Sequence, residues 1–258
     1  AIQVFQCPGQ NMLFASKSGE IAIWQQAKFP ARWYGQGLFV MPGEDSSYQW
    51  QGYIPQKENP HVINPERGFI VSANQRPVDS TYPYFIPGNY ITMRGLTITR
   101  RLEGMEHITP EDMMKLQYDY YNTFAEEARP LLMKYIREND LNADGKKYLD
   151  MVKNWDLQAG PYSTGQTVFT TWWDSLMVVV FQDELDQVHP EGVMPESQTL
   201  LEALLKDSTF KYIDNINTPQ KETLFDDVTA AFQKSVPILQ QEEKDDKLQW
   251  TKHQDPTI

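Results

Sequence analysis

Hydrophobic and polar positions follow different patterns in the two parts of the chain. Over residues 1–105, short alternating or aromatic-rich runs are separated by glycine and proline, which is typical of strands and loops. These runs are "NMLFAS", "EIAIWQQ", "YQWQGYI" and "RGFIVSA", and residues 2–5 also have a strand pattern. Helical periods dominate residues 106–258. The sequence therefore predicts an α+β chain, with a strand-rich part at 1–105 and a mainly helical part at 106–258.

The helical pattern begins at Thr109, which has the properties of a helix N-cap. Pro110 follows at the first helical position, with Glu111 and Asp112 in the first turn. Apolar residues then recur at helical spacing, which predicts one helix with a buried stripe. The stripe consists of Met113, Leu116, Tyr120 and Phe124. Further helical periods are found at 147–156, 166–182, 197–206 and 219–236. The acidic run "QQEEKDDK" is interpreted as a solvated connector.

Composition and charge exclude some classes of partner. The 258 residues, 40% of them hydrophobic, are enough to bury one large core or two small ones. A net charge of -12 and a pI near 4.8 argue against nucleic acid, whose binding depends on a basic surface. No stretch approaches about 18 consecutive apolar residues, and the dense run at 167–181 is interpreted as a core helix. We expect neither a nucleic-acid partner nor a membrane partner.

The segment "DLNADGKKYLDM", residues 140–151, matches the opening of a helix-loop-helix calcium loop. The matching residues are Asp140, Asn142, Asp144 and Gly145. The twelfth position, which should hold a bidentate glutamate, is Met151. The alternative is a polar turn between two helices, with Gly145 in a left-handed conformation. Because the strongest ligand is missing, we expect no metal site here.

Other residue types give no catalytic signal by themselves. Cys7 is the only cysteine, and with Pro8 after it and no histidine nearby it is more typical of packing than of a nucleophile. The histidines lack metal-ligand spacing; they are His61, His107, His189 and His253. The many aromatic residues suit a core or an interface, or else a sugar-binding face. No nucleophile elbow, phosphate loop or dinucleotide fingerprint is present.

An ordered series of stretches across the first 120 residues carries a resemblance to a known family. The stretches are "PGQNMLFASKSGEIAIW" (8–24), "FPARWYGQGLFVMPG" (29–43), "YQWQGYIPQKENPHVINPERGFIVSANQRP" (48–77), "YITMRGLTITRRL" (90–102) and "TPEDMMKLQYD" (109–119). In kind and order they resemble the penicillin amidase (penicillin acylase) family of N-terminal nucleophile hydrolases, within its large β chain. Beyond residue 120 the resemblance thins to "NWD" at 154–156 and "W-x-K-H" at 250–253.

The resemblance implies part of a four-layer αββα core and hydrolysis of an N-acyl amide. The family's nucleophile is an N-terminal serine whose own α-amine is the base. Ala1 has no hydroxyl or thiol. We therefore expect a fragment of a longer protein, inactive alone and completed by an α chain and the remaining β chain. Penicillins, cephalosporins and acyl-homoserine lactones are all candidate substrates. A periplasmic or secreted location is implied for the parent protein.

Two site residues follow from the resemblance. Asn74 in "GFIVSANQRP" falls where the family has its oxyanion-hole asparagine, at the end of a predicted buried strand. Arg94 in "ITMRGLTI" falls at an arginine that borders the active site and orients that asparagine. An amide N–H held there can donate to the negative oxygen formed in acyl transfer. From the residues alone, the alternatives are a turn residue for Asn74 and a helix-start surface charge for Arg94.

No cofactor is expected in this chain. Relatives bind a structural calcium, which the resemblance implies only for the full-length parent protein. Where some of them have an aspartate ligand, this chain reads "STYPYFIPGN", without a matching acid. We therefore do not extend the calcium site to this chain.

A second hypothesis stays open, namely a non-catalytic binding or interaction module. Its aromatic, acidic surface would recognise a protein partner or a glycan. The parent reading frame discriminates between the two hypotheses. Only the acylase hypothesis requires a "G-S-N"-like processing site and an α-chain-like region upstream of Ala1.

Overall fold

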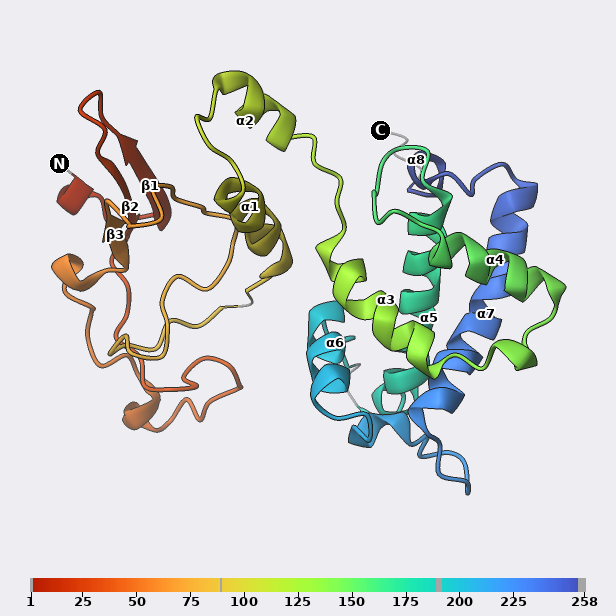
Figure 1. Cartoon of the computed structure of the whole chain (residues 1–258). Helices are drawn as coiled ribbons and strands as arrows, with labels where there is room; N and C mark the ends of the chain where they lie inside the picture. Colours follow the sequence, from red (N-terminus) through yellow and green to blue (C-terminus); the bar gives the residue numbers. More distant parts are fainter. Residues whose placement is uncertain (1, 89, 189–191, 255–258) are drawn as a thin grey trace. The chain divides into compact units, whose positions relative to one another are not determined.

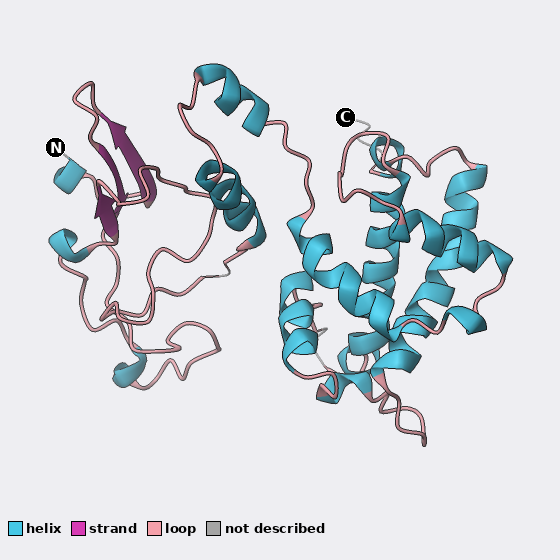
Figure 2. Ribbon diagram, viewed as in Figure 1, coloured by secondary structure: helices cyan, strands magenta, loops and turns pink. Residues whose placement is uncertain are grey.

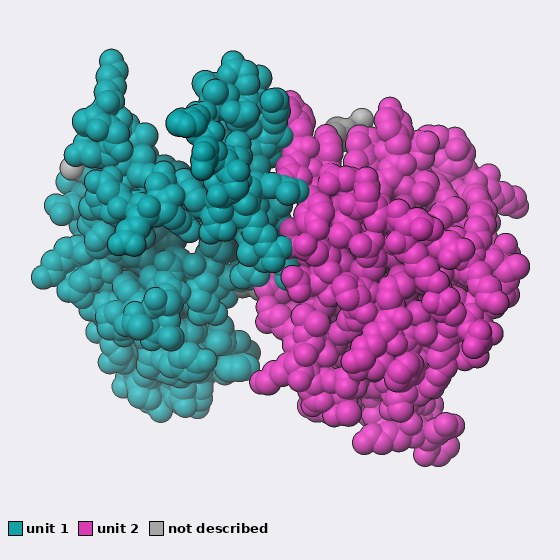
Figure 3. Space-filling model, in the orientation of Figure 1, with its two compact units in different colours: residues 1–116 teal, residues 117–258 magenta. Residues whose placement is uncertain are grey.

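The computed structural model describes residues 2–88, 90–188 and 192–254. The chain forms two compact units, residues 1–116 and residues 117–258 (Figure 3). Ala1 and His189, which were singled out in the sequence, lie outside the described residues.

The first unit contains a three-stranded antiparallel sheet in the order β1-β2-β3 (Figure 1). The strands are β1 (Gln10–Ala15), β2 (Ile21–Gln26) and β3 (His61–Ile63). The predicted strands at 11–16 and 20–26 are confirmed as the hairpin of β1 and β2. Asn11 pairs with Gln25, and Ile23 pairs with Val62. Because side chains alternate along a strand, these four residues lie on one face of the sheet.

The rest of this unit has less strand than the sequence predicts. Residues 2–5 do not form a strand, because Ile2–Val4 is a 3-10 turn. The run at 48–54 contributes only an isolated bridge between Tyr53 and Pro30. The remaining elements are the 3-10 turns η2 (Ser46–Tyr48) and η3 (Gln56–Glu58) and the helices α1 (Met93–Glu103) and α2 (Pro110–Leu116). The α+β class holds, with a smaller sheet than expected.

The second unit is helical (Figure 2). Its elements are α3 (Thr123–Tyr135), η4 (Glu138–Asp140), α4 (Ala143–Lys153), α5 (Thr164–Leu185), α6 (Ser197–Lys206), η5 (Lys211–Ile213), α7 (Leu224–Lys244) and α8 (Trp250–His253). The predicted core helix is α5, which packs along α7. The buried Trp172 ring lies 4.6 Å from that of Phe232, and its Nε1 donates to the Val228 carbonyl at 3.1 Å. Among the described helices, none is long and apolar enough to cross a membrane.

The helix predicted from Thr109 is in fact two helices, α2 and α3. Thr109 caps α2 as expected, since its Oγ1 accepts from the Asp112 N–H at 3.3 Å. The chain then leaves the helix, and the Asp119 carboxylate accepts from the Tyr121 N–H at 3.0 Å, a local turn that competes with helix. The prediction that these four apolar residues form one buried stripe on a single helix is therefore wrong. Met113 and Tyr120 are exposed, whereas Phe124 packs on Trp173 with ring centroids 4.9 Å apart.

The acidic run at 240–247 is mostly helix rather than a connector, because α7 continues to Lys244. Glu243 accepts from Lys147 Nζ at 2.5 Å and from the Tyr148 hydroxyl at 2.8 Å. These contacts tie the end of α7 to α4. They also explain why like charges are tolerated in the last turns of the helix.

Residues 140–151 run from the last residue of η4 through the first nine residues of α4. Asn142 is the N-cap of α4, with its Oδ1 accepting from the Gly145 N–H at 2.8 Å. Gly145 is not in a left-handed turn, as the alternative interpretation held, but is buried within the helix. A Cβ there would lie 3.2 Å from the Leu141 Cβ, which explains the glycine.

We expect calcium to bind residues 140–151 with at best about millimolar affinity. Asn142 is engaged as a cap, Asp144 accepts from Gln240 Nε2 at 2.6 Å, and Met151 offers no carboxylate. Calorimetry with calcium on the chain measures this directly. A micromolar site that disappears in Asp140→Ala, but not in the control Asp156→Ala outside the segment, would contradict the expectation.

Candidate functional site

Residues 69–73 form a segment without regular secondary structure that is not paired with any described strand. The predicted buried strand at 68–73 is therefore wrong, although its alternating pattern has a structural cause. Phe69, Val71 and Ala73 share one apolar cluster with Ile98 and Leu102 of α1. The intervening side chains line a cleft instead. The pattern thus reports a segment packed on a helix rather than a strand in a sheet.

The cleft, about 240 Å³ in volume, lies between this segment and one face of the sheet. From the sheet it is lined by Asn11, Ile23, Gln25 and Val62, and from the segment by Ile70, Ser72 and Asn74. Asn11 Nδ2 donates to Ser72 Oγ at 2.9 Å, a hydrogen bond that joins the two walls. Arg67 and Arg76 also line it, so a chain of negative net charge places two cations here.

Asn74 is exposed and has a left-handed backbone, with φ of 62°. Its Oδ1 accepts a hydrogen bond from Arg94 Nη2, although the two residues are 20 positions apart. Because a guanidinium can only donate, this contact fixes which end of the amide faces Arg94. The Nδ2 hydrogens are turned away from the arginine and, among the described residues, have no hydrogen-bond acceptor, so they are available to donate.

Arg94 is the second residue of α1 and is exposed, whereas the next residue, Gly95, is buried. The structure thus brings both sequence-predicted site residues into direct contact. The same geometry also fits the alternatives, because Asn74 is a turn residue and Arg94 is a charge at a helix start. These alternatives do not require Asn74 and Arg94 to be hydrogen-bonded to each other at a cleft.

Of the other residues considered in the sequence, His61 also lines the cleft. Cys7 is exposed, so its interpretation as a packing residue is wrong. The His61 ring stacks on Trp24 with centroids 3.9 Å apart, and His107 is an exposed residue with φ of 52°. His253 Nδ1 lies 2.8 Å from the Glu242 carboxylate. Within the described residues, no three His, Cys, Asp or Glu side chains are arranged to hold a metal.

Sequence reasoning missed the residues that support the pair. The sequence indicates only a strand residue for Asn11, although a polar residue opening the apolar run "NMLFA" is a signal for a special contact. It indicates no role for Arg76, whose guanidinium lies 5.2 Å from the centre of the Tyr90 ring. Burial raises the pKa of Tyr90, and the Arg76 charge opposes that rise. The contact between Arg76 and Tyr90 thus adds to the hydrogen bond between Asn74 and Arg94.

The chain is similar in sequence to known proteins. The family model described as penicillin amidase matches residues 1–258. An acyl-homoserine lactone acylase, QuiP of Pseudomonas syringae pv. syringae, is 24% identical over 236 residues, covering 82% of this chain and 28% of that protein. The penicillin acylase 2 proenzyme of Pseudomonas sp. strain SE83 is 33% identical over 110 residues, covering 42% of this chain and 14% of that protein.

A solved structure shows the same fold. The thermostable penicillin G acylase from Alcaligenes faecalis matches with a TM-score of 0.61 and 20% identity, covering 93% of this chain and 47% of that chain. The chain spans about 28% of the length of the QuiP relative above. It therefore corresponds to one part of such a protein.

Proposed function

Since the chain belongs to the penicillin amidase family, we propose that it is part of an N-acyl amide hydrolase and that Asn74 donates to the oxyanion. The observation that carries this proposal is the hydrogen bond from Arg94 to Asn74 Oδ1 at the edge of a cleft. This hydrogen bond orients the Asn74 side-chain amide through its oxygen and leaves the N–H groups of the amide to donate to a substrate.

The chemistry follows from where charge develops. Attack of a nucleophile on an amide carbonyl turns the carbonyl oxygen into an oxyanion, and a fixed N–H there is worth roughly 3–4 kcal/mol in comparable sites. In this proposal Asn74 Nδ2 gives that hydrogen bond and Arg94 holds the amide. The nucleophile is the N-terminal residue that autoprocessing exposes in the parent protein, and the α-amine of that residue is the base. One relative's name, a proenzyme, supports a precursor form.

The proposed substrate class is a small N-acyl amide. The matched relatives are named acyl-homoserine lactone acylase and penicillin acylase, and both names state an acylase activity. The cleft beside Asn74 combines apolar Ile23, Val62 and Ile70 with cationic Arg67 and Arg76. Such a wall suits a molecule with both an apolar and an anionic part. No cofactor takes part in the proposed reaction, and the proposed location is the periplasm or the outside of the cell.

The rest of the parent chain is the proposed protein partner. Apolar side chains are exposed on both faces of the sheet: Leu13 and Val62 on the cleft face, and Phe14 and Ile63 on the other. A small sheet with both faces apolar needs covering elements on each side. An α chain and the remaining β chain would supply them.

The parent protein, once processed, is expected to hydrolyse N-acyl amides that the 258-residue chain alone does not. A panel of phenylacetyl and long-chain acyl anilides, with an acyl-homoserine lactone, measures the activity by release of the amine. Turnover by the purified chain, with contaminating acylase excluded, would contradict the division of roles. A processed parent inactive on the whole panel would contradict the proposed reaction.

A second candidate function, glycan binding, rests on an aromatic hollow of about 460 Å³ lined by Tyr48, Trp50 and Tyr53. Sugars stack on ring faces, yet Lys28 Nζ lies 4.1 Å from the centre of the Tyr53 ring and the Arg32 guanidinium 5.7 Å from that of Trp50. These cations compete for the rings. The acylase function is therefore the better supported of the two.

A further inference from the structure

The side chain of Gln75 binds the backbone of the segment that leads to Asn74. Its Oε1 accepts from the Ala73 N–H at 2.6 Å, and its Nε2 donates to the Val71 carbonyl at 2.7 Å. In a sheet, a neighbouring strand would satisfy such backbone groups. Here one side-chain amide satisfies a carbonyl and an N–H within the same loop.

Gly95 of α1 holds Gln75 from the other side. A Cβ on Gly95 would lie 3.3 Å from Gln75 Oε1 and 3.4 Å from its Cβ. Gly95 is buried, so the glutamine packs closely on the helix. Two consecutive loop residues thus meet two consecutive helix residues: Asn74 contacts Arg94, and Gln75 contacts Gly95.

These contacts restrict the backbone of Asn74. The N–H of the preceding residue, Ala73, is bound by the side chain of the following residue, Gln75. Asn74 itself has φ of 62°, a conformation that residues with a Cβ rarely adopt. Rotating Asn74 out of it would break the Gln75 hydrogen bonds or move Gln75 against Gly95. The direction of the Asn74 amide therefore depends on Gln75.

We propose that Gln75 is a positioning residue that holds the Asn74 amide in its donating geometry, with Gly95 as the surface against which it packs. This rests on the proposed function, in which Asn74 stabilises the oxyanion. Gln75 acts through Asn74 and has no chemical step of its own. Its loss should therefore lower kcat more than it changes KM.

The test is Gln75→Met in the full-length processed enzyme, because methionine keeps a similar volume but makes neither backbone hydrogen bond. We expect kcat to fall about tenfold or more with KM changed by less than about threefold. The matched control is Gln51→Met, since this exposed glutamine also donates to a loop carbonyl, that of Gln49, at 3.0 Å. Gln51→Met should keep the wild-type kcat.

Gly95→Ala is the second variant and keeps the test decisive if Gln75→Met does not fold. Alanine has the higher helix propensity, so α1 loses nothing, but its Cβ pushes Gln75 by a few tenths of an ångström. We expect an unchanged or higher Tm together with a lower kcat. A merely structural role of the contact would not separate these two readouts.

Asn74→Ala, measured in parallel, separates two failures. If Asn74→Ala loses kcat while Gln75→Met and Gly95→Ala keep it, the positioning role is wrong and the proposed function stands. If Asn74→Ala keeps the wild-type kcat, both are wrong. In support, the double variant Asn74→Ala with Gln75→Met should be no slower than Asn74→Ala alone, because the residues act as one unit.

Discussion

Asn74→Ala in the processed full-length enzyme is expected to lower kcat by about a hundredfold or more while KM changes little. The lost N–H contact is stronger in the transition state, where the carbonyl oxygen is negative, than in the bound substrate. Steady-state kinetics on an acyl anilide measures both constants. Folding should survive, because the side chain is exposed and its removal leaves no buried group unpaired.

The matched control is Asn64→Ala. Asn64 also has a left-handed backbone, with φ of 47°, and its Oδ1 accepts from the Ile21 N–H at 2.9 Å. Alanine in this conformation costs about 1 kcal/mol, a cost that both variants share. Only Asn74→Ala should lose activity. If Asn74→Ala kept its kcat, Asn74 would be a turn residue and nothing more.

Arg94→Ala should be milder than Asn74→Ala, and its effect should overlap with that of Asn74→Ala instead of adding to it. The guanidinium touches the far end of the amide and does not reach the reacting oxygen in this proposal. Without the guanidinium the Asn74 amide can rotate, so a smaller fraction of the molecules has Nδ2 in position to donate to the oxyanion. The double variant should therefore be close to Asn74→Ala alone. Additive losses would show that Arg94 has a separate role in the reaction.

Long periodic segments were predictable from the sequence because their own side chains determine the structure. The helix at 197–206 has the predicted bounds, and the dense run at 167–181 lies inside α5. The hairpin of β1 and β2 was also predictable, since it is local and alternates clearly. In each case the pattern of one segment reports its burial without knowledge of distant contacts.

The segment at 68–73 shows where this reasoning fails. Its hydrophobic and polar residues do alternate, but one set of side chains packs on α1 and the other lines the cleft. The Gln75 side-chain amide takes the backbone hydrogen bonds that a neighbouring strand was expected to make. Hydrophobic periodicity does not indicate which group makes the hydrogen bonds to the backbone N–H and carbonyl groups of a segment. The pairing of Asn74 with Arg94 came from the family resemblance, because no local pattern links residues 20 positions apart.

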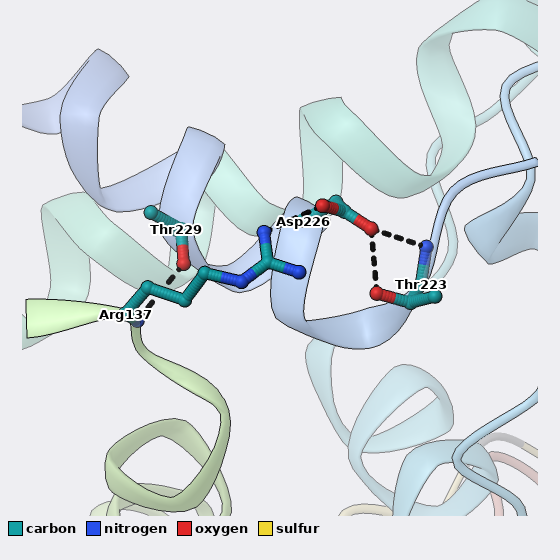
Figure 4. Close-up of polar contacts among 4 residues, drawn as sticks. All are labelled: Arg137, Thr223, Asp226 and Thr229. Atoms are coloured by element: carbon teal, nitrogen blue, oxygen red, sulfur yellow. Dashed lines mark hydrogen bonds and ion pairs between the residues drawn. The ribbon is translucent and has the colours of Figure 1, made fainter. Parts of the chain in front are cut away.

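The adjacent carboxylates Asp226 and Asp227 at the start of α7 are a second case. Both lie within the helical period predicted at 219–236, and in the structure both fall in the first turn of α7, where acids are favourable. In the structure Asp226 faces outward and accepts from Thr223 Oγ1 at 2.5 Å and Arg137 Nη1 at 2.5 Å (Figure 4). Asp227 is only 4% exposed, and its Oδ2 has no hydrogen-bond partner within the described part of the chain. The two neighbours therefore have opposite environments.

The pKa values of the pair move in opposite directions. Hydrogen bonds from Thr223 and Arg137 lower the pKa of Asp226 to about 2. Burial, reinforced by the charges of Glu222, Asp226, Asp183 and Asp214, raises the pKa of Asp227 to about 8. Burial and the neighbouring Asp183 also raise the pKa of Glu184 to about 7. Asp183 is buried as well and accepts from the Ile216 N–H at 2.8 Å.

The chain is therefore expected to lose stability as the pH rises from about 4 to about 8. The folded state binds a proton at Asp227 that the unfolded state, with an ordinary carboxyl pKa near 4, has released. The contribution of this proton is complete below about pH 4 and is lost as the pH passes the folded pKa. Four pKa units correspond to about 5 kcal/mol of unfolding free energy. Glu184 acts in the same direction, whereas Asp226 acts oppositely and only at acid pH.

Denaturant unfolding of the chain at a series of pH values, followed by circular dichroism, measures this dependence. Asp227→Asn keeps the shape of the protonated carboxyl but cannot ionise, so its stability should change much less between about pH 5 and 8 and exceed that of the wild type at pH 8. Asp226→Asn is the matched control: it loses an ionised, hydrogen-bonded carboxylate and should be less stable throughout this range. Most of the pH dependence should remain in this variant, because burial is the largest cause of the raised Asp227 pKa and the Asp226 charge only adds to it. If Asp227→Asn kept the wild-type slope, Asp227 would not be the group that takes up the proton, and the pH dependence would come from Glu184 instead.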